Sequence, residues 1–397
     1  MKQVSIIGTG MGTEATLTIE GKREIEQAKL LIGAKRVLAG FSRESGKEFL
    51  EEYKEEAVLE AIWQSKADRI AVLMSGDVGF YSGAKRLYPL LKESCQVRLI
   101  PGISSLSYFS ARLGISWEDA AIISIHGRRE NVLQAVKGNT KLFLLGGGSF
   151  HETIKELVDG GMGEKRAYIG ENLSYETEKI STGTLQELSQ KEYEPLSVML
   201  ILNEQPECKM PYGIPEESFV RGNVPITKSE VRAVAMSKLA VANHEILYDI
   251  GAGTGSVSVE MALAAFGGRV YAIEGKEEAI SLIKENKRKF GLANLEIIEG
   301  MAPKAMEPLE KPHAAFIGGS SGKIDEIIKL LLHKNPHVRI VLSAIAIETV
   351  GKVLELCREL SISKVEIVQV AVSKAREMGN VHMLMGQNPI YIITINA

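Results

Sequence analysis

The chain has 397 residues, of which 45% are hydrophobic and 24% charged, and its formal net charge is -3. Because domains usually hold roughly 100–200 residues, this length predicts two or three globular domains, and the slightly acidic balance argues against a general nucleic-acid binder. No apolar run approaches the roughly 18 residues of a membrane span, and the run at 4–7 is too short for a signal peptide, so we expect a cytoplasmic protein.

The cysteines Cys95, Cys208 and Cys357 are widely spaced and form no C-x-x-C pair. This pattern supports neither a disulfide framework nor a cysteine zinc site. We therefore predict buried thiols in a reducing compartment. No group of potential ligands has the spacing of a metal centre, and we predict none.

Residues 1–204 alternate predicted strands with predicted helices, for example helices over 16–31 and 48–63. The first strand, residues 4–7, runs directly into a glycine-rich turn. Further strands are predicted at 69–74, 97–100, 121–125, 141–145, 166–169 and 197–202. The alternation predicts an α/β domain with mainly parallel sheets. A break at Pro101 and Gly102 predicts two lobes with a cleft between them.

A linker is predicted at residues 205–222, because the stretch from Gln205 to Phe219 contains three prolines and no helical or strand period. Residues 223–397 form the second predicted domain. Its strands are predicted at 246–250, 269–274, 295–299, 314–317, 339–344, 364–370 and 390–394, and its helices at 229–242, 256–265, 276–290, 323–333 and 347–360. This order predicts a doubly wound sheet. Thr227 and Glu230 fit a capping box at the first helix.

The second domain carries a glycine turn, Gly251-Ala252-Gly253-Thr254-Gly255, between its first strand and the following helix. Glycines at such a turn allow positive φ and a close approach of the backbone to a ligand. Glu274 ends the next strand, where a carboxylate can accept both hydroxyls of a ribose. The pattern is G-x-G-x-G, whereas a dinucleotide diphosphate normally uses G-x-G-x-x-G. Together with Asp249 just before the turn, it favours a sulfonium methyl donor.

Three loops of the first domain follow predicted strands in the same way. They are Gly8-Thr9-Gly10-Met11-Gly12, the segment 75–82 with Gly76-Asp77-Val78-Gly79, and 101–105 with Ser104-Ser105. Because strand ends meet at one edge of an open α/β sheet, three such loops predict a ligand crevice. Asp77 could simply cap a turn, but its place between glycines favours a role that faces the ligand.

The second domain resembles the seven-strand S-adenosylmethionine methyltransferases, and more narrowly the decarboxylating precorrin C-15 methyltransferases of cobalamin biosynthesis. The segments that carry this resemblance are 213–219, 225–228, 249–258, 316–320 and 388–393, and it covers about residues 213–397. Two departures are Met301, where relatives usually have an acid that meets the adenine amino group, and the segment 343–346, where relatives often have Asn-Ala-Val-Thr.

The first domain resembles the tetrapyrrole methylase family, and in particular its C-5 methyltransferase member. The three glycine loops carry this resemblance, together with His126-Gly127-Arg128 and the segment 170–178, over about residues 1–203. Two mild departures are Val78, where the family usually has proline, and Met11 in the usual Gly-Pro-Gly opening. The resemblance implies a two-lobed tetrapyrrole methylase fold in front of a seven-stranded Rossmann-like methyltransferase fold.

Together the resemblances imply a bifunctional enzyme that uses S-adenosyl-L-methionine in each half. The first half would methylate C-5 of a precorrin-type tetrapyrrole, and the second would methylate C-15 and release the carboxyl of the C-12 acetate as carbon dioxide. Methyl transfer needs mainly alignment of the methyl carbon with its nucleophile and exclusion of water. We expect an anionic tetrapyrrole as substrate, no nucleic-acid or membrane partner, and a homo-oligomer, a dimer or a tetramer.

The implied site residues fall into two groups. The expected catalytic residues are Asp77, His126, Arg128 and Arg376, with Arg376 and also Arg232 as candidates to bind substrate carboxylates. The expected cofactor-binding residues are Gly8, Gly10, Gly12, Gly76, Asp77, Val78, Gly79, Ser104, Ser105, Thr227, Asp249, Gly251, Gly253, Thr254, Gly255, Glu274, Met301, Ala302 and Gly318.

Three other functions stay open at this point. Only one half could be active, with the other a donor-binding or regulatory module, for which Met301 is the best indication. A dinucleotide-dependent oxidoreductase is disfavoured by the missing sixth-position glycine of both loops. Methylation of RNA or small amines by the second half is disfavoured by the absence of an amine-methylating motif and by the acidic balance.

Overall fold

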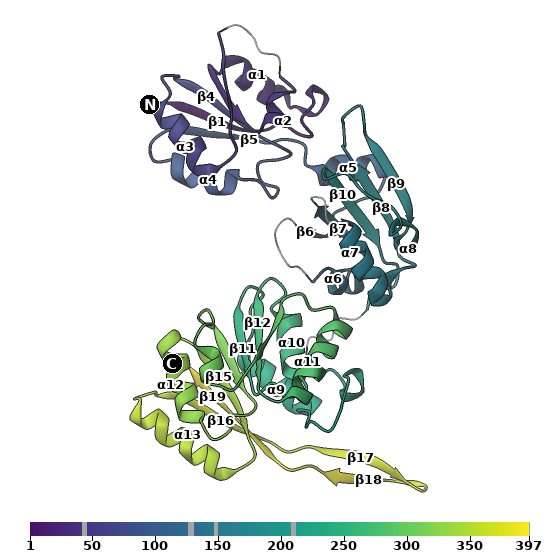
Figure 1. Ribbon diagram of the computed structural model, residues 1–397, viewed down its shortest axis with the longest axis vertical. Coiled ribbons are helices and arrows are strands. Elements are labelled where there is room, and N and C mark those ends of the chain that lie inside the picture. The colour runs from purple at the N-terminus through teal and green to yellow at the C-terminus, as the bar shows by residue number, and fades with distance from the viewer. Residues whose placement is uncertain (42–45, 126–130, 147–149, 208–211, 397) are drawn as a thin grey trace. The chain divides into compact units, whose positions relative to one another are not determined.

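The computed structural model describes residues 1–41, 46–125, 131–146, 150–207 and 212–396 (Figure 1). The chain folds as two compact units, one of Met1–Arg128 with Asn139–Gln205, the other of Arg129–Gly138 with Pro206–Ala397. In the described ranges no helix has both the length and the apolar character needed to cross a membrane.

The first lobe of the first unit is built on a parallel sheet with the strand order β3-β2-β4-β1-β5. Its elements are β1 (Gln3–Gly8), α1 (Ile19–Gln27), β2 (Leu30–Gly33), α2 (Lys35–Leu38), β3 (Glu48–Glu51), α3 (Glu55–Gln64), β4 (Arg69–Met74), α4 (Ala84–Leu91) and β5 (Gln96–Ile100). Val4 and Ile6 pack with α3 and α4, whereas Ile7 packs with α1 and α2 on the other face. Burial on both faces explains why β1 and β4 are nearly continuous apolar runs.

Two predicted helices of this lobe are partly wrong. The helix expected over 16–31 ends at Gln27, and Leu30–Gly33 is strand β2. The helix expected over 48–63 begins only at Glu55, because Glu48–Glu51 forms strand β3. Four-residue segments with only two or three apolar residues fit a strand or a helix equally well, and only the pairing partner decides between them.

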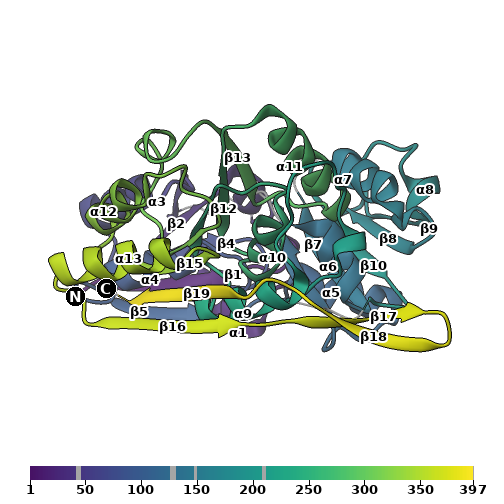
Figure 2. The ribbon, with the colours of Figure 1, turned by 90° about the horizontal axis from the view of Figure 1, so that it is seen from below.

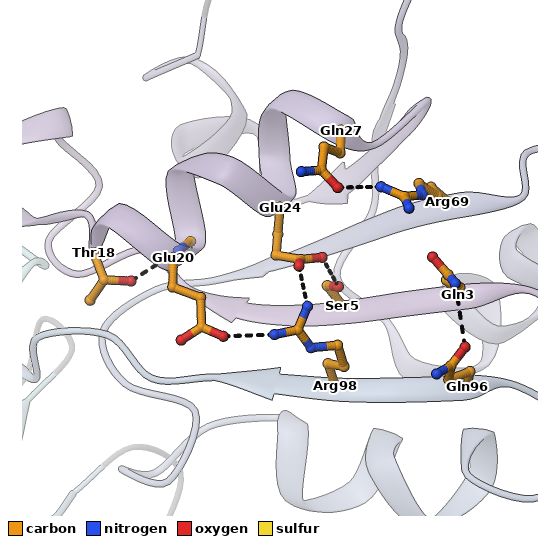
Figure 3. A network of polar contacts seen from close by, with 10 residues as sticks. Gln3, Ser5, Thr18, Glu20, Glu24, Gln27, Arg69, Gln96 and Arg98 are labelled. Carbon is orange, nitrogen blue, oxygen red and sulfur yellow. Dashed lines mark hydrogen bonds and ion pairs between the residues drawn. The ribbon is translucent and has the colours of Figure 1, made fainter.

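A polar network fixes α1 across the edge of this sheet (Figure 3). The Ser5 hydroxyl on β1 donates to Glu24 Oε2 at 2.7 Å. Arg98 on β5 forms ion pairs with Glu20, at 2.8 Å, and with Glu24. Thr18 caps the helix by accepting a hydrogen bond from the Gly21 amide at 3.1 Å. These contacts join α1 to two neighbouring strands and so support the glycine turn that follows β1.

The second lobe of the first unit contains a mixed sheet with the order β6-β7-β10-β8-β9. Its elements are α5 (Ser105–Leu113), β6 (Ala121–Ser124), β7 (Lys141–Gly146), α7 (Phe150–Leu157), β8 (Arg166–Glu171), β9 (Lys179–Thr184), α8 (Leu185–Leu188) and β10 (Ser197–Leu202). The prediction of mainly parallel sheets is wrong here, because only β6 and β7 pair in parallel. Seven residues join β8 to β9, and a parallel crossover needs about a dozen or more, so this connection forces antiparallel pairing.

The second unit holds a seven-stranded sheet in the order β13-β12-β11-β14-β15-β19-β16. Its strands are β11 (Ile246–Ile250), β12 (Arg269–Glu274), β13 (Leu295–Glu299), β14 (Ala314–Ile317), β15 (Arg339–Ala344), β16 (Lys364–Val370) and β19 (Ile390–Asn396), and its helices are α9 (Ser229–Leu239), α10 (Ser256–Ala264), α11 (Glu277–Phe290), α12 (Ile324–Lys334) and α13 (Ile347–Glu359). The predicted strands are confirmed, the last one extended by two residues. Residues of α9, α10 and α11 cover one face and residues of α12 and α13 the other, which gives a three-layer doubly wound fold.

One helix of this unit comes from before the linker. Helix α6 (Val132–Gly138) folds with the second unit although it lies between β6 and β7 in sequence. The buried Asn131 just ahead of it accepts a hydrogen bond from the Ala293 amide at 2.7 Å and donates one to Asn294 Oδ1 at 2.8 Å. The second unit therefore needs residues that precede the linker for its complete structure.

The sequence analysis missed a two-stranded ribbon, β17 (Ser373–Met378) and β18 (Val381–Gly386). It leaves the sheet between β16 and β19 (Figures 1 and 2). Every residue of its two strands is exposed. The charged residues, methionines and glycines of this ribbon do not alternate regularly between apolar and polar, so the sequence gave no sign of its strands. Arg376, on β17, is thus an exposed residue of this ribbon.

A buried ion pair fastens the linker to the second unit. Arg232 on α9 and Glu260 on α10 have no exposed side-chain surface, and Arg232 Nε lies 2.8 Å from Glu260 Oε1. The Glu260 carboxylate also accepts the amides of Gly213, at 3.1 Å, and Ile214, at 2.9 Å. Arg232 donates to the carbonyl oxygens of Ile214 and Thr227 as well. The Arg232–Glu260 pair therefore holds both ends of the segment 213–227, which precedes α9.

The predicted capping box at α9 is wrong. The helix begins at Ser229 with Lys228 in the N-cap position and without a side-chain cap from that residue. The Ser229 amide instead donates to Glu216 Oε1 at 2.9 Å, so a linker residue performs the capping. Tertiary contact has replaced the local hydrogen bonds that the sequence pattern offered.

We expect Arg232→Met to lower the free energy of unfolding of the second unit by about 3–5 kcal/mol, because it leaves a buried carboxylate without a counter-charge. Hydrogen exchange of the α9 and α10 amides measures this directly. Arg269→Met, in the same unit, is the control, since Arg269 is half-exposed in its ion pairs with Glu296 and Glu310 and such pairs contribute about 1 kcal/mol or less. Equal effects of the two substitutions would contradict the role of the buried pair.

Candidate functional site

The carboxyl ends of β11 and β14 come into backbone contact in the second unit. Gly251, Gly253 and Gly255 all have positive φ, between 58° and 76°, as the glycine pattern predicts. A Cβ atom on Gly251 would lie 2.6 Å from the carbonyl oxygen of Gly319, the second residue after β14. The turn therefore needs glycine here both for its φ and for the approach of the neighbouring loop.

Glu274 braces the glycine turn from the end of β12. Its carboxylate accepts the amides of Gly253 at 2.9 Å, Gly275 at 2.8 Å and Lys276 at 2.9 Å. The side chain is buried apart from a small fraction facing the cavity described below. These bonds fix the carboxylate at the position where an acid in a doubly wound fold meets a ribose.

Asp249 lies beneath the turn and is almost fully buried. The Ser258 hydroxyl donates to its carboxylate. Burial raises the pKa of Asp249 to about 7, the Ser258 hydrogen bond opposes this rise, and the charge of Glu274 adds to it. The residue is therefore partly protonated near neutral pH, and a change in local charge shifts its protonation readily.

These residues surround a cavity of about 930 Å³. Of the residues predicted to bind the cofactor, it is lined by Thr227, Asp249, Gly251, Gly253, Thr254, Glu274, Met301, Ala302 and Gly318. Gly255 is outside this set, and its missing side chain makes room for Ile283, which would lie 3.1 Å from a Cβ atom at that position. The cavity thus gathers the ends of β11, β12, β13, β14 and β15 at one edge of the sheet, as a switch-point site requires.

The lining suits S-adenosyl-L-methionine. Glu274 offers an oxygen acceptor for ribose hydroxyls. No atom lies closer than 3.5 Å to the position that a Cβ atom on Gly253 would take, so the backbone there is open to a ligand. Met301 is 53% exposed and its sulfur lies over Gly275, so it presents an apolar surface where an acid would present a carboxylate. Compared with the acid that the resemblance leads us to expect, Met301 offers no carboxylate to an adenine amino group but has a surface on which a flat ring can pack.

In the first unit the three glycine loops touch one another. A Cβ on Gly8 would lie 2.7 Å from both the Gly102 nitrogen and the Gly76 oxygen. Gly10 and Gly76 exchange backbone hydrogen bonds of 3.2 and 2.6 Å. Gly8 and Gly102 therefore need to be glycine for the packing of loop on loop, and this packing brings the three strand ends to one edge.

Asp77 holds two of these loops together. Its Oδ1 accepts the Gly79 amide at 2.8 Å, and its Oδ2 accepts the Gly102 amide at 3.0 Å. This is the turn-capping role that the sequence left as an alternative, extended to a second loop. A catalytic role for Asp77 stays a prediction.

The remaining predicted residues of the first unit have local roles in the structure. Ser104 caps α5 by accepting the Ser107 amide at 3.1 Å, and Ser105 is the first residue of that helix. Val78 packs against the core of the first lobe. Gly12 faces Tyr175, whose hydroxyl accepts a hydrogen bond from Arg36 at 2.8 Å. His126 and Arg128 lie outside the described residues.

The two arginines expected to bind substrate carboxylates do not line the cavity. Arg232 is fully buried, and its guanidinium bonds to Glu260 and to two backbone carbonyl oxygens. The expectation that Arg232 binds a substrate carboxylate is therefore wrong. Arg376 lies on the exposed ribbon. The sequence shows that these residues are charged but gives no sign of which one is buried.

Comparison with known proteins covers both units. The family described as "Precorrin methyltransferase domain" matches residues 218–396, and "Tetrapyrrole (Corrin/Porphyrin) Methylases" matches residues 3–189. The precorrin-6Y C(5,15)-methyltransferase (decarboxylating) of a Sinorhizobium species is 31% identical over 329 residues, which are 81% of this chain and 79% of that protein.

Two shorter relatives each match just under half of this chain. The probable cobalt-precorrin-6B C(15)-methyltransferase (decarboxylating) of Pyrobaculum calidifontis is 39% identical over 47% of this chain and 96% of its own length. The cobalt-precorrin-6B C(15)-methyltransferase (decarboxylating) of Salmonella typhimurium is 37% identical over 45% of this chain and 93% of its own length.

The raised pKa of Asp249 predicts a pH-dependent stability. Because the folded-state pKa, about 7, lies above the ordinary value of 3.8, the folded protein binds more protons between these values and loses stability as pH rises through them. We expect Asp249→Asn to remove this loss, so its stability relative to wild type should rise by about 2–3 kcal/mol between pH 5 and pH 8. Urea unfolding of both proteins at the two pH values measures the difference. A pH-independent difference would contradict the assignment.

Proposed function

The chain belongs to the family of decarboxylating precorrin-6Y C(5,15)-methyltransferases, and from this membership we propose that it methylates a precorrin-type tetrapyrrole at C-5 and C-15 and removes the carboxyl of the C-12 acetate. The observation that carries the proposal is that each unit gathers its own glycine turns at the carboxyl ends of parallel strands. Two such edges in one chain support two methyl-donor sites.

In the second unit, Gly251, Gly253 and Glu274 would hold the donor at the cavity edge. S-adenosyl-L-methionine, when bound, supplies an electrophilic methyl group on a sulfonium. The residues of the chain position the two reactants in line and exclude water, which is where such enzymes gain most of their rate. Beyond the donor end the cavity wall is mixed, with apolar side chains such as Ile345 beside polar ones such as Asn388. A carboxylate drawn against the apolar part would be destabilised relative to a neutral product.

In the first unit, the loops that follow β1 and β4 and the loop before α5 would hold the second donor. Asp77 would act here by fixing the loops, through the amides of Gly79 and Gly102. The cytoplasmic location and the absence of nucleic-acid partners remain part of the proposal, supported by the composition and the net charge of -3.

The alternative in which only one half is active rests on a specific observation, namely the apolar, half-exposed Met301 at the adenine end of the cavity. It predicts that one of the two methylations is absent. Separate inactivation of the two edges distinguishes the alternatives.

Incubation of the full chain with methyl-labelled S-adenosylmethionine and a precorrin-6-type substrate tests the proposal, with products read by mass spectrometry and NMR. We expect two labelled methyl groups and loss of one carbon dioxide. Gly251→Ala should lower the rates of C-15 methylation and decarboxylation at least about tenfold, because it combines positive φ with a backbone clash, and should spare C-5. Gly8→Ala should do the reverse.

Gly351→Ala is the matched control, because a Cβ at this helical position meets no atom within 4 Å. It should leave both methylations intact. Loss of both methylations in either site variant, with normal folding, would contradict the assignment of one reaction to each unit.

We also propose that the chain forms a homo-oligomer through the β17–β18 ribbon. Leu384 is 74% exposed, and Met378, Val381, Met383 and Met385 are about half-exposed. By the register of the ribbon, Met378, Val381, Met383 and Met385 share one face and Leu384 lies on the other. Isolated two-stranded ribbons are marginally stable in water, and apolar side chains exposed on both faces offer surface that a second copy of the chain can cover.

Light scattering tests this contact. Leu384→Lys should reduce the particle mass to that of a smaller assembly, whereas Ile19→Lys, at an equally exposed isoleucine of the first unit, should not. A wild-type monomer would refute the oligomer, and an unchanged mass for Leu384→Lys would refute the ribbon as its interface.

A further inference from the structure

The cavity of the second unit contains two cationic side chains, Lys228 and Lys276. They lie in different parts of its wall. Lys276 follows the donor-side residues Glu274 and Gly275, and its side chain is exposed. Lys228 comes from the segment ahead of α9 and is half-buried. With Arg232 buried and Arg376 absent from the lining, Lys228 is the cation available to a second ligand beside the donor.

Lys228 has no ion-pair partner in the described part of the chain. Two glutamates of this part of the fold, Glu216 and Glu230, both pair with Lys374, at 3.7 and 2.9 Å. Glu216 also accepts the Ser229 amide. Glu216 also interacts electrostatically with Lys228, but it lies beyond ion-pair distance and is paired with Lys374. Lys228 can therefore still meet an anionic group that arrives with a ligand.

The backbone around Lys228 is held from both sides. Arg232 donates to the Thr227 carbonyl oxygen, and the Lys228 carbonyl oxygen accepts the Arg232 amide at 2.8 Å. Glu216 fixes the next residue by capping Ser229. The buried Arg232–Glu260 pair therefore fixes the position from which the Lys228 side chain enters the cavity wall, and pre-organisation of this kind lowers the entropy lost on binding.

The same cavity also offers an exposed apolar surface. Ile345, after β15, is 66% exposed, and Met301 is 53% exposed. Both line the cavity together with polar groups such as Asn388. A ligand that covers these apolar side chains and also meets Lys228 has a large apolar body and a carboxylate at its edge.

We propose that Lys228 binds a carboxylate that the tetrapyrrole keeps throughout the reaction, and so sets the orientation of the macrocycle in the second unit. The inference rests on the proposed function. The retained carboxylates are the appropriate partners, because an ammonium bound to the departing carboxylate would stabilise the ground state against loss of carbon dioxide. Lys228 is accordingly a specificity-determining residue. Its contact with the retained carboxylate stabilises the ground state and the transition state equally.

The test is steady-state kinetics of C-15 methylation and of C-5 methylation in the same full-length protein. Lys228→Met should raise KM for the tetrapyrrole in the C-15 reaction about tenfold or more, the size of a lost charged hydrogen bond, with kcat within about twofold. Lys228→Arg should restore most of the affinity. Salt should raise KM of the wild type more steeply than KM of Lys228→Met, because the lost attraction is screened.

Lys329→Met, at an exposed lysine of α12 outside the cavity lining, is the control for the loss of one positive charge. Affinity for S-adenosylhomocysteine should be unchanged in all variants, which establishes that the donor end is intact. An unchanged KM for Lys228→Met, or a fall in kcat alone, would overturn the assignment while leaving the proposed function standing. A wild-type protein that binds S-adenosylhomocysteine but converts no tetrapyrrole would overturn both.

Discussion

Arg232 and Glu260 form an ion pair without solvent exposure, and the site of the second unit is assembled around it. The pair accepts or donates hydrogen bonds at Gly213, Ile214 and Thr227. It thereby fixes the proline-rich linker to the unit and holds the following residues, 224–228, which form part of the cavity wall. Because a buried pair is strongly destabilising when one partner is lost, this wall and the packing of α9 on α10 depend on each other.

Both units use glycine for the same physical purpose. At Gly251 and at Gly8 the missing side chain lets one strand-end loop touch the next, with a Cβ position 2.6–2.7 Å from neighbouring backbone. Carboxylates then fix the loops through backbone amides, Glu274 in the second unit and Asp77 in the first. The two folds differ in sheet topology, yet in each the loops at the strand ends are joined by close backbone packing and by a carboxylate that accepts backbone amides.

Much of the second unit could be predicted from its sequence, because parallel strands buried on both faces are short apolar runs between amphipathic helices. The glycine turn and Glu274 follow from the same pattern. The ribbon β17–β18 could not, since no buried face imposes an alternation on it. Arg232 and the cap of α9 were misjudged because their partners, Glu260 and Glu216, are distant in sequence. Strand β2 was taken for helix because its four apolar residues acquire their conformation from pairing with β4.

The central claim is that one chain carries two methyl-donor sites. Calorimetric titration of S-adenosylhomocysteine into the intact protein tests it most directly, and the intact chain is needed because α6, from before the linker, folds with the second unit. The account predicts two binding sites per chain, one in each unit. A single site per chain, with the second unit silent, would contradict it and would mean that Met301 and its neighbours have lost the donor.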